Sequence, residues 1–421
     1  MTRRAVVALC SAAVALIMLV ASPRAQTPIP TASSRVVKIV GDSHKLLLRA
    51  DGSVAGWGQY KHGQLGRVVA ITPTPRGAAS ALVPIDLPAK AVDIAANGGS
   101  SYALLEDGTV MAWGRGDAGQ LGIGPVKPPL LATSEPSFEY RGIETPTRVG
   151  GVDDAIAIAA DGGSAYAVLR DGTVHAWGGG NIGDGRAKSD YAGPPSTAGP
   201  AFVPVRVPDL ENVVAVSAGG GHVLALAKDG RVFSWGSNFY GALGRPPRVE
   251  LALDRAGEVP NLTDVVQVVA GLGVSTVLKK DGTVWVWGSN WQQQFGFPAP
   301  TDQPGLNRGW VLEPQQVPGL TGVTAIAVGS GRQSIALLKD GTLRVWGNTD
   351  WGQLGNGAGP GFHPRPAAIK IANVAAVFAA GNNSFAVLRD GALWAWGAGN
   401  SGEFPLTAHT RVPMPAPAGL R

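Results

Sequence analysis

One eight-residue string, Asp-Gly-x-Val/Leu-x-x-Trp-Gly, recurs seven times and restricts the possible folds of this chain more than any other feature. The copies begin at Asp51, Asp107, Asp171, Asp229, Asp281, Asp340 and Asp390. Successive copies start between 50 and 64 residues apart. Periods of this length are typical of propellers and solenoids, in which each repeat is one supersecondary unit.

Each copy predicts a β-hairpin. The Asp-Gly pair supplies the positive φ of a tight turn, and an apolar run such as Val223–Ala227 precedes it. After the turn, Val284 and Val286 alternate with Trp285 and Trp287, which is the period of a β-strand. The tryptophan at the seventh position of each string is therefore predicted to be buried. These residues are Trp57, Trp113, Trp177, Trp235, Trp287, Trp346 and Trp396.

Glycine-rich bends and proline-containing strands complete the unit, which has about four short strands, the size of one propeller blade. The first repeat begins at Arg35 without a preceding proline-containing strand, and the chain ends with one at Thr410–Leu420. We therefore expect an all-β, seven-bladed β-propeller with four-stranded antiparallel blades. In this prediction the C-terminal strand completes the first blade and so closes the ring.

The units resemble the regulator of chromosome condensation repeat, in which a Gly-rich bend, the Asp-Gly hairpin and an Asn-x-x-Gly-Gln-Leu-Gly loop follow one another. The best copies are Gly219–Gly244 and Trp346–Gly355, and the resemblance covers residues 35–421. It implies a seven-bladed propeller. The family includes a nuclear guanine-nucleotide exchange regulator and a plant ultraviolet sensor, but the Gly-Trp-Arg-His-Thr motif of the sensor is absent here. Some secreted bacterial relatives of this fold are β-lactamase inhibitors.

Residues 1–25 are predicted to be a cleaved signal peptide. Arg3 and Arg4 precede the uncharged run Ala5–Val20, and small residues offer cleavage positions near Ser22 and Ala25. The alternative is a membrane anchor, for which this run of 16 residues is short. Residues 26–34 are then a linker, and residues 35–421 form a single domain. We expect a secreted or periplasmic protein of the bacterial type, with no membrane span after cleavage.

Composition excludes several classes of function. The net charge is +5, and it falls to +2 without Arg3, Arg4 and Arg24, so nucleic acid is not an expected partner. The Gly-x-Gly-x-x-Gly strings at Gly114, Gly178 and Gly397 follow hairpin strands and precede no predicted helix, which argues against a dinucleotide site. We expect no cofactor, no metal and no catalytic residues.

Two local patterns have structural interpretations. Gly41-Asp42-Ser43 resembles an esterase nucleophile motif, but it aligns with the glycine-rich bends of the other repeats. His44 and His222 share one repeat position, which Val274 fills elsewhere, so we expect buried hydrogen bonds rather than metal ligation.

The loop after each Trp-Gly pair is the first candidate for binding. Its third to fifth positions past the tryptophan hold aromatic residues in repeats one, four, five and six, and aromatic residues anchor many interfaces. The candidate residues are Tyr60, Phe239, Tyr240, Trp291 and Trp351. The alternative is that they pack locally. The Pro- and Gly-rich connections 122–144 and 181–203 are a second candidate.

These observations predict a secreted, non-catalytic and monomeric scaffold that binds a protein or cell-surface partner. The family resemblance makes an inhibitor-like role one specialisation. Two alternatives stay open: a guanine-nucleotide exchange factor-like regulator, and an enzyme with an unrecognised site at the channel mouth.

Overall fold

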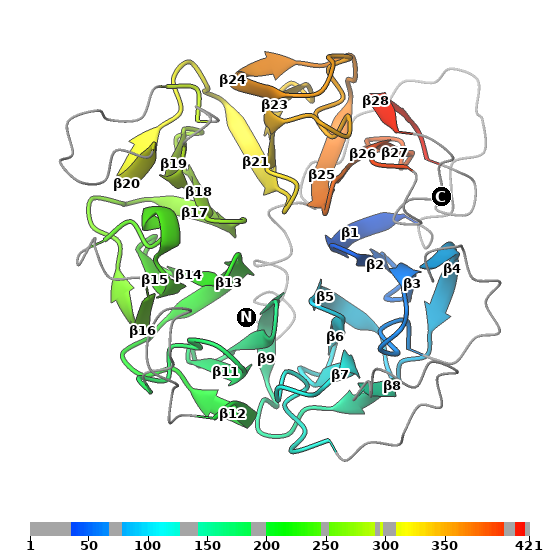
Figure 1. The fold of residues 1–421 in the computed structure, drawn as a ribbon, viewed down its shortest axis with the longest axis vertical. Helices are drawn as coiled ribbons and strands as arrows, with labels where there is room; N and C mark the ends of the chain where they lie inside the picture. Colours follow the sequence, from blue (N-terminus) through cyan, green and yellow to red (C-terminus); the bar gives the residue numbers. More distant parts are fainter. Residues whose placement is uncertain are drawn as a thin grey trace, which may run out of the picture.

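The computed structural model describes residues 35–66, 78–126, 142–186, 199–245, 252–290, 295–297, 309–399 and 409–416. Seven four-stranded sheets stand as blades around a central axis (Figure 1). Each sheet takes its four strands in chain order, and neighbouring strands are antiparallel. The predicted all-β, seven-bladed propeller with four-stranded antiparallel blades is therefore confirmed. None of the helical segments in the described part of the chain is long and apolar enough to cross a membrane.

The first two strands of each blade lie nearest the axis. The innermost strands are β1 (Val36–Gly41), β5 (Ala91–Asn97), β9 (Ala155–Asp161), β13 (Val213–Gly219), β17 (Val265–Ala270), β21 (Val323–Val328) and β25 (Val374–Ala380). The second strands are β2 (His44–Arg49), β6 (Ser100–Leu105), β10 (Ser164–Leu169), β14 (His222–Ala227), β18 (Val274–Lys279), β22 (Gln333–Leu338) and β26 (Asn383–Leu388). A glycine-rich bend joins each such pair, and Gly41-Asp42-Ser43 is one of these bends, as the repeat alignment predicts.

The third and fourth strands form the outer half of each blade. The third strands are β3 (Val54–Gln59), β7 (Val110–Arg115), β11 (Val174–Gly178), β15 (Val232–Ser237), β19 (Val284–Ser289), β23 (Leu343–Asn348) and β27 (Leu393–Gly397). The outermost strands are β4 (Ala78–Ile85), β8 (Gly142–Arg148), β12 (Ala201–Arg206), β16 (Ala252–Glu258), β20 (Trp310–Gln316), β24 (Phe362–Ala368) and β28 (Thr410–Pro415). Proline within outer strands, such as Pro204, removes backbone donors from the exposed edges and so discourages edge-to-edge pairing.

The seven repeat tryptophans lie between blades, where each is at most 1% exposed. In several repeats the indole Nε1–H donates to a carbonyl in the Trp-Gly loop of the preceding blade. Trp113 donates to Gln64 O at 3.0 Å, and Trp396 donates to Gln353 O at 2.9 Å. The predicted buried ring of tryptophans is confirmed, and the residues also fasten each blade to its neighbour.

The prediction that the C-terminal strand completes the first blade is wrong. Strand β4 completes that blade, because Gly58 of β3 pairs with Ala79. Strand β28 pairs instead with β27, through Gly397 and Thr410, and is the outer strand of the seventh blade (Figure 1). The proline-containing strand ends each unit rather than beginning it, so every blade is contiguous in the chain and no strand is exchanged between the first and last blades.

Side-chain packing closes the ring instead. Trp57 of the first blade meets Phe385 of the seventh edge-on, with ring centroids 6.3 Å apart. Val36 and Ile39 of β1 belong to the same buried cluster, as does Ala416 directly after β28. The backbone N–H of Ala416 donates to Leu393 O at 2.8 Å, so the end of β28 is tied to its own blade and buried in the closing seam.

Several predictions fall on residues outside the described ranges. The signal peptide, 1–25, and the linker, 26–34, lie outside them, as does Trp291. The same holds for residues 127–141 and 187–198, which make up most of the two long connections.

Candidate binding face

Two faces of the propeller differ in the loops that they carry. Because successive strands of a blade are antiparallel, the glycine-rich bends and the Trp-Gly loops lie at one end of the blades. The Asp-Gly hairpins and the connections between blades lie at the other end. We call these ends the loop face and the hairpin face. The four candidate aromatic residues that the structure describes belong to Trp-Gly loops and therefore to the loop face.

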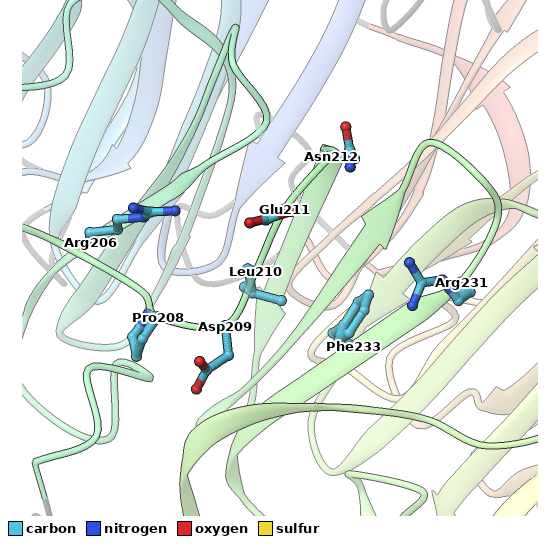
Figure 2. Close-up of a pocket in the computed structure, with 8 residues that line it drawn as sticks. All are labelled: Arg206, Pro208, Asp209, Leu210, Glu211, Asn212, Arg231 and Phe233. Carbon is cyan, nitrogen blue, oxygen red and sulfur yellow. The ribbon is translucent and has the colours of Figure 1, made fainter.

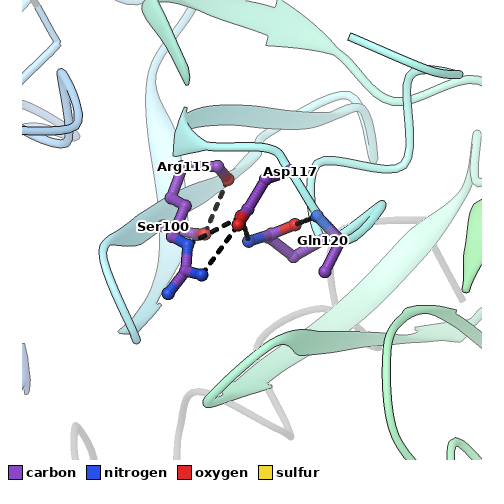
Figure 3. A network of polar contacts seen from close by, with 5 residues as sticks. Ser100, Arg115, Asp117 and Gln120 are labelled. Atoms are coloured by element: carbon purple, nitrogen blue, oxygen red, sulfur yellow. Dashed lines mark hydrogen bonds and ion pairs between the residues drawn. The ribbon is translucent and has the colours of Figure 1, made fainter. Parts of the chain in front are cut away.

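The Trp-Gly loop of the second blade shows how such a loop is held in shape (Figure 3). The Arg115 guanidinium donates to both carboxylate oxygens of Asp117, at 2.6 and 2.7 Å, and this hydrogen bonding lowers the pKa of Asp117. Gln120 Nε2 donates to the same carboxylate at 2.9 Å, while its Oε1 accepts the backbone N–H of Ala118 at 2.7 Å. Ser100 Oγ donates to Arg115 O at 2.9 Å. These contacts hold the loop in one shape through its own side chains.

In several Trp-Gly loops nine residues follow the tryptophan up to the last glycine of the loop, as from Trp57 to Gly66. Two positions of these nine-residue loops have distinct roles. The fourth residue past the tryptophan is the tip of the loop. It is exposed in the four loops of this length whose tips the structure describes, where it is Lys61, Asp117, Phe239 and Asp350. The fifth residue packs toward the next blade in two of these loops: His62 lies over Gly99, and Tyr240 lies over Gly273. The fifth position therefore favours local packing, while the fourth position is the exposed tip.

Phe239 is the exception among these four described tips, because the other three are charged. In the fifth repeat the sequence has Trp291 at this position, which lies outside the described residues. The side chain of Phe239 is 49% exposed. The loop differs here because Ala242 stands where the first, second and sixth blades have a bracing glutamine. Phe239–Gly241 instead forms a 3-10 turn, η2. Within it Tyr240 adopts φ +68°, a left-handed conformation that costs a non-glycine residue free energy.

An apolar ridge extends from Phe239 across the seam between the fourth and fifth blades. The Phe239 and Tyr240 rings are 5.1 Å apart between centroids, and Tyr240 lies 5.8 Å from the ring of Trp310. Leu272, which is next to Gly273 in the bend of the fifth blade, is 45% exposed. The equivalent position holds glycine or Asp42 in the other six blades. Sequence reasoning missed Leu272 and Trp310, although the alignment of the bends contains the signal for Leu272.

The other candidates do not join this ridge. Tyr60 is half-buried and packs against a small cluster of Leu65, Ala79 and Val83 in its own blade, which supports the local-packing alternative for this residue. Trp351 is 46% exposed and contacts His409 between the sixth and seventh blades. The structure therefore distributes the described aromatic candidates over three separate places on the loop face.

The hairpin face carries an open groove of about 560 Å³ between the third and fourth blades (Figure 2). The connection from Arg206 to Asn212 lines it together with Arg231 and Phe233. Arg231 lies over the Phe233 ring at 5.4 Å and pairs with Asp229 at 2.8 Å. The groove is polar, and the charge of Arg231 is neutralised by its own hairpin.

Buried polar groups near the loops are used for structure. His222 Nε2 and Ser275 Oγ are 2.9 Å apart across a blade seam, and His44 makes the equivalent contact with Ser101 at 2.8 Å. The expected buried hydrogen bonds of the two histidines are confirmed. Among the described residues, no group of three or more His, Cys, Asp or Glu side chains is arranged to hold a metal ion.

Comparison with known proteins identifies the family. The profile of the RCC1-like domain matches residues 133–419, and that of the regulator of chromosome condensation (RCC1) repeat matches residues 91–120. The chain belongs to the RCC1-like family. Among the proteins similar to this RCC1-like propeller is the human E3 ubiquitin-protein ligase HERC2, with 28% identity over 333 residues, which are 75% of this chain but 6% of HERC2.

The RCC1-like propeller is also similar to the regulator of chromosome condensation of Mus musculus, with 37% identity over 158 residues, 36% of this chain and 35% of the mouse protein. The crystal structure of Prp20p from Saccharomyces cerevisiae has the same fold, with a TM-score of 0.64 and 23% identity over 82% of this chain and 80% of that one. The chain thus spans a small part of HERC2 and about a third of the mouse regulator, so their whole-protein activities are not transferred by these matches.

Proposed function

We propose that this RCC1-like propeller is a secreted, non-catalytic scaffold that binds a partner protein through the ridge of Phe239, Tyr240 and Leu272. Membership of the family supports a regulatory or binding role. The observation that carries the proposal is that two large apolar side chains, Phe239 and Leu272, are exposed on adjacent blades. Leu272 stands where the other blades have glycine or Asp42, and Phe239 stands where the other described loops of its length have a charged residue. Aromatic and apolar anchors of this kind supply much of the energy of protein interfaces.

The conformation of the ridge supports the same proposal. Tyr240 is held at positive φ between Phe239 and Trp310, so the ridge is formed before a partner arrives. A surface that is already ordered loses little conformational entropy on binding. An inhibitor-like role is one form that such binding takes.

The export part of the proposal rests on Arg3, Arg4 and the apolar run that follows them. Recovery of the chain from the medium or the periplasm, with an intact mass that starts after Ser22 or Ala25, supports it. Recovery solely from the cytoplasm with Met1 retained contradicts it.

The binding test uses the exported chain as bait and measures the affinity of the purified partner for variants. Phe239→Ala and Leu272→Ser are expected to weaken binding at least about tenfold each, the usual effect of removing an interface anchor. Val412→Ala is the control, because Val412 is 54% exposed on β28, away from the ridge. Equal affinity of all three variants and the original chain contradicts the proposal, provided that their thermal midpoints agree.

Guanine-nucleotide exchange is a second candidate, favoured by the match to the mouse regulator. Its test is the release of fluorescent GDP from a loaded small GTPase in the presence of the chain. Accelerated release that depends on chain concentration favours this candidate over a plain scaffold.

A further inference from the structure

Trp351 presents an indole at the seam between the sixth and seventh blades, away from the apolar ridge. The residue occupies the fifth loop position, where His62 and Tyr240 lie over the next glycine bend. Trp351 instead contacts the imidazole of His409, with ring centroids 4.9 Å apart and planes inclined by 59°. The two rings thus form a wedge, and 46% of the tryptophan stays exposed.

The wedge carries a hydrogen-bond donor. His409 Nδ1 accepts the backbone N–H of Gly399 at 3.1 Å. A ring nitrogen that accepts a hydrogen bond carries no proton, so the ring N–H of His409 is at Nε2. His409 therefore offers an N–H group beside the indole.

The residue before Trp351 supplies an acceptor on the same loop tip. Asp350 precedes Trp351 and is exposed. Its Oδ2 accepts a hydrogen bond from Asn348 Nδ2 at 2.9 Å, which fixes the orientation of the carboxylate. A carboxylate has lone pairs for several hydrogen bonds, so acceptor capacity is left over for a ligand.

The loop that carries these groups is braced in the manner of the second blade. Gln353 Oε1 accepts the backbone N–H of Trp351 at 2.9 Å, and Gln353 Nε2 donates to Asn348 Oδ1 at 2.9 Å. The same amide group donates to Gly331 O at 3.1 Å, which ties the loop to the bend of its own blade. The indole, the donor and the acceptor are therefore held in place before any ligand binds.

We propose that Trp351, His409 and Asp350 form a binding platform for saccharides whose rings have equatorial hydroxyl groups, such as β-linked glucose or N-acetylglucosamine. The face of an aromatic ring is electronegative, and it attracts the weakly positive C–H groups on the apolar face of such a sugar. The hydroxyl groups at the rim of the sugar both donate and accept, which matches Asp350 and the His409 Nε2–H.

Other ligand classes use this set of groups less completely. A cationic side chain would be attracted by the indole and the carboxylate, but it has no acceptor for the His409 N–H group. An apolar side chain would bury the donor and the carboxylate without partners, which costs free energy. A neutral, hydroxylated ligand satisfies all three groups.

The experiment is calorimetric titration of the full chain with cellopentaose and with chitopentaose. We expect saturable binding of at least one probe, lowered at least about tenfold by Trp351→Ala, because the stacking surface is removed. Trp351→Phe should retain part of the affinity. His409→Phe should weaken binding several-fold, because it keeps a ring beside Trp351 but removes the donor. Phe239→Ala is the matched control, since it removes an exposed aromatic ring from another blade and should leave the affinity unchanged.

Three outcomes would overturn the proposal. The first is no saturable binding of either probe by the original chain up to about 10 mM, a concentration that detects even weak sites. The second is an unchanged affinity in Trp351→Ala. The third is Trp351-dependent binding of a lysine- and arginine-rich peptide without binding of either sugar. The ridge and this platform lie at different seams, so failure here leaves the protein-binding proposal standing, and the reverse also holds.

Discussion

At the scale of the residue, His44 and His222 lie fully buried at two equivalent seams. Each contacts a serine of the next blade, and Ser275 in turn donates to Ala242 O at 2.7 Å. Burial lowers the pKa of His44 to about 3, with further lowering by the Lys45 charge, and burial lowers the pKa of His222 to about 4. Both imidazoles are therefore neutral in the folded protein at pH values where the unfolded chain binds a proton.

This difference predicts an acid-sensitive stability. Below pH 6.5 the unfolded chain takes up protons at both histidines while the folded chain does not, so the free energy of unfolding falls as the pH drops. The fall is up to about 1.4 kcal/mol per pH unit for each histidine, until the folded-state pKa values are reached. Urea titrations between pH 7 and pH 4.5 measure it, a window above the range in which most carboxylates titrate.

His222→Gln provides the control for this prediction, because the equivalent position of the sixth blade holds a buried glutamine, Gln333. The variant should lose the share of the pH dependence that His222 contributes, while His44 and the partly buried His62 and His175, whose pKa values burial also lowers, keep theirs. A slope that is unchanged in His222→Gln would show that other groups cause it.

At the scale of the element, the Trp-Gly loops join the blades as well as presenting side chains. The last glycine of the loop lies directly under the tryptophan of the next blade. A Cβ on Gly355 would lie 2.7 Å from Trp396 Nε1, and Gly355 has φ +67°. The positive φ and the short distance to the indole both require glycine at this position. Gly355 therefore sets the distance between the sixth and seventh blades.

Two alanine substitutions separate the effect of the positive φ from the effect of the close contact with the indole. Gly357 has a similar φ of +77°, but the nearest atom to its Cβ position is Val412 Cγ1 at 3.9 Å. Gly357→Ala should cost about 1–2 kcal/mol of stability for the backbone conformation alone. Gly355→Ala should cost at least about 2 kcal/mol more, because the methyl group displaces a buried indole. Chemical denaturation measures the stability of both variants. Equal losses of stability would mean that the two blades can shift apart around the added methyl group at little cost in free energy.

At the scale of the whole molecule, the ring is closed by packing between complete blades. Strand β28 supplies no hydrogen bonds to the first blade, yet Ala416 at its end is buried against Val36, Trp57 and Phe385. The last strand therefore contributes both an outer edge to its own blade and part of the closing seam.

Deletion of residues 408–421 should lower the thermal midpoint by more than about 5 °C, since it removes the pairing of β28 with β27 and part of the closing cluster. Val412→Ala, a change at an exposed position of the same strand, should leave the midpoint nearly unchanged. Differential scanning calorimetry of both variants tests this, and a deletion variant as stable as the full chain would show that the ring does not depend on its last strand.

Much of the fold was predictable because its determinants are local. An Asp-Gly turn, a strand with period two and a tryptophan at a fixed offset act within one hairpin, and seven copies of that hairpin imply seven blades. The exposed loop tip Phe239 was found in the same way, from its offset past Trp235. The buried hydrogen bonds of His44 and His222 followed from the alignment of the repeats.

Only the tertiary structure decided which strand begins a blade and how the ring closes. A chain of repeats looks the same from any starting strand, so the periodicity cannot tell a proline-containing strand that opens a blade from one that ends it. The hydrogen-bond partners of β4 and β28 settle that choice. The same reason applies to the surface. The pairings of Tyr240 with Trp310 and of Trp351 with His409 join residues far apart in the chain, and strand pairing and blade packing, rather than any local signal, bring them together.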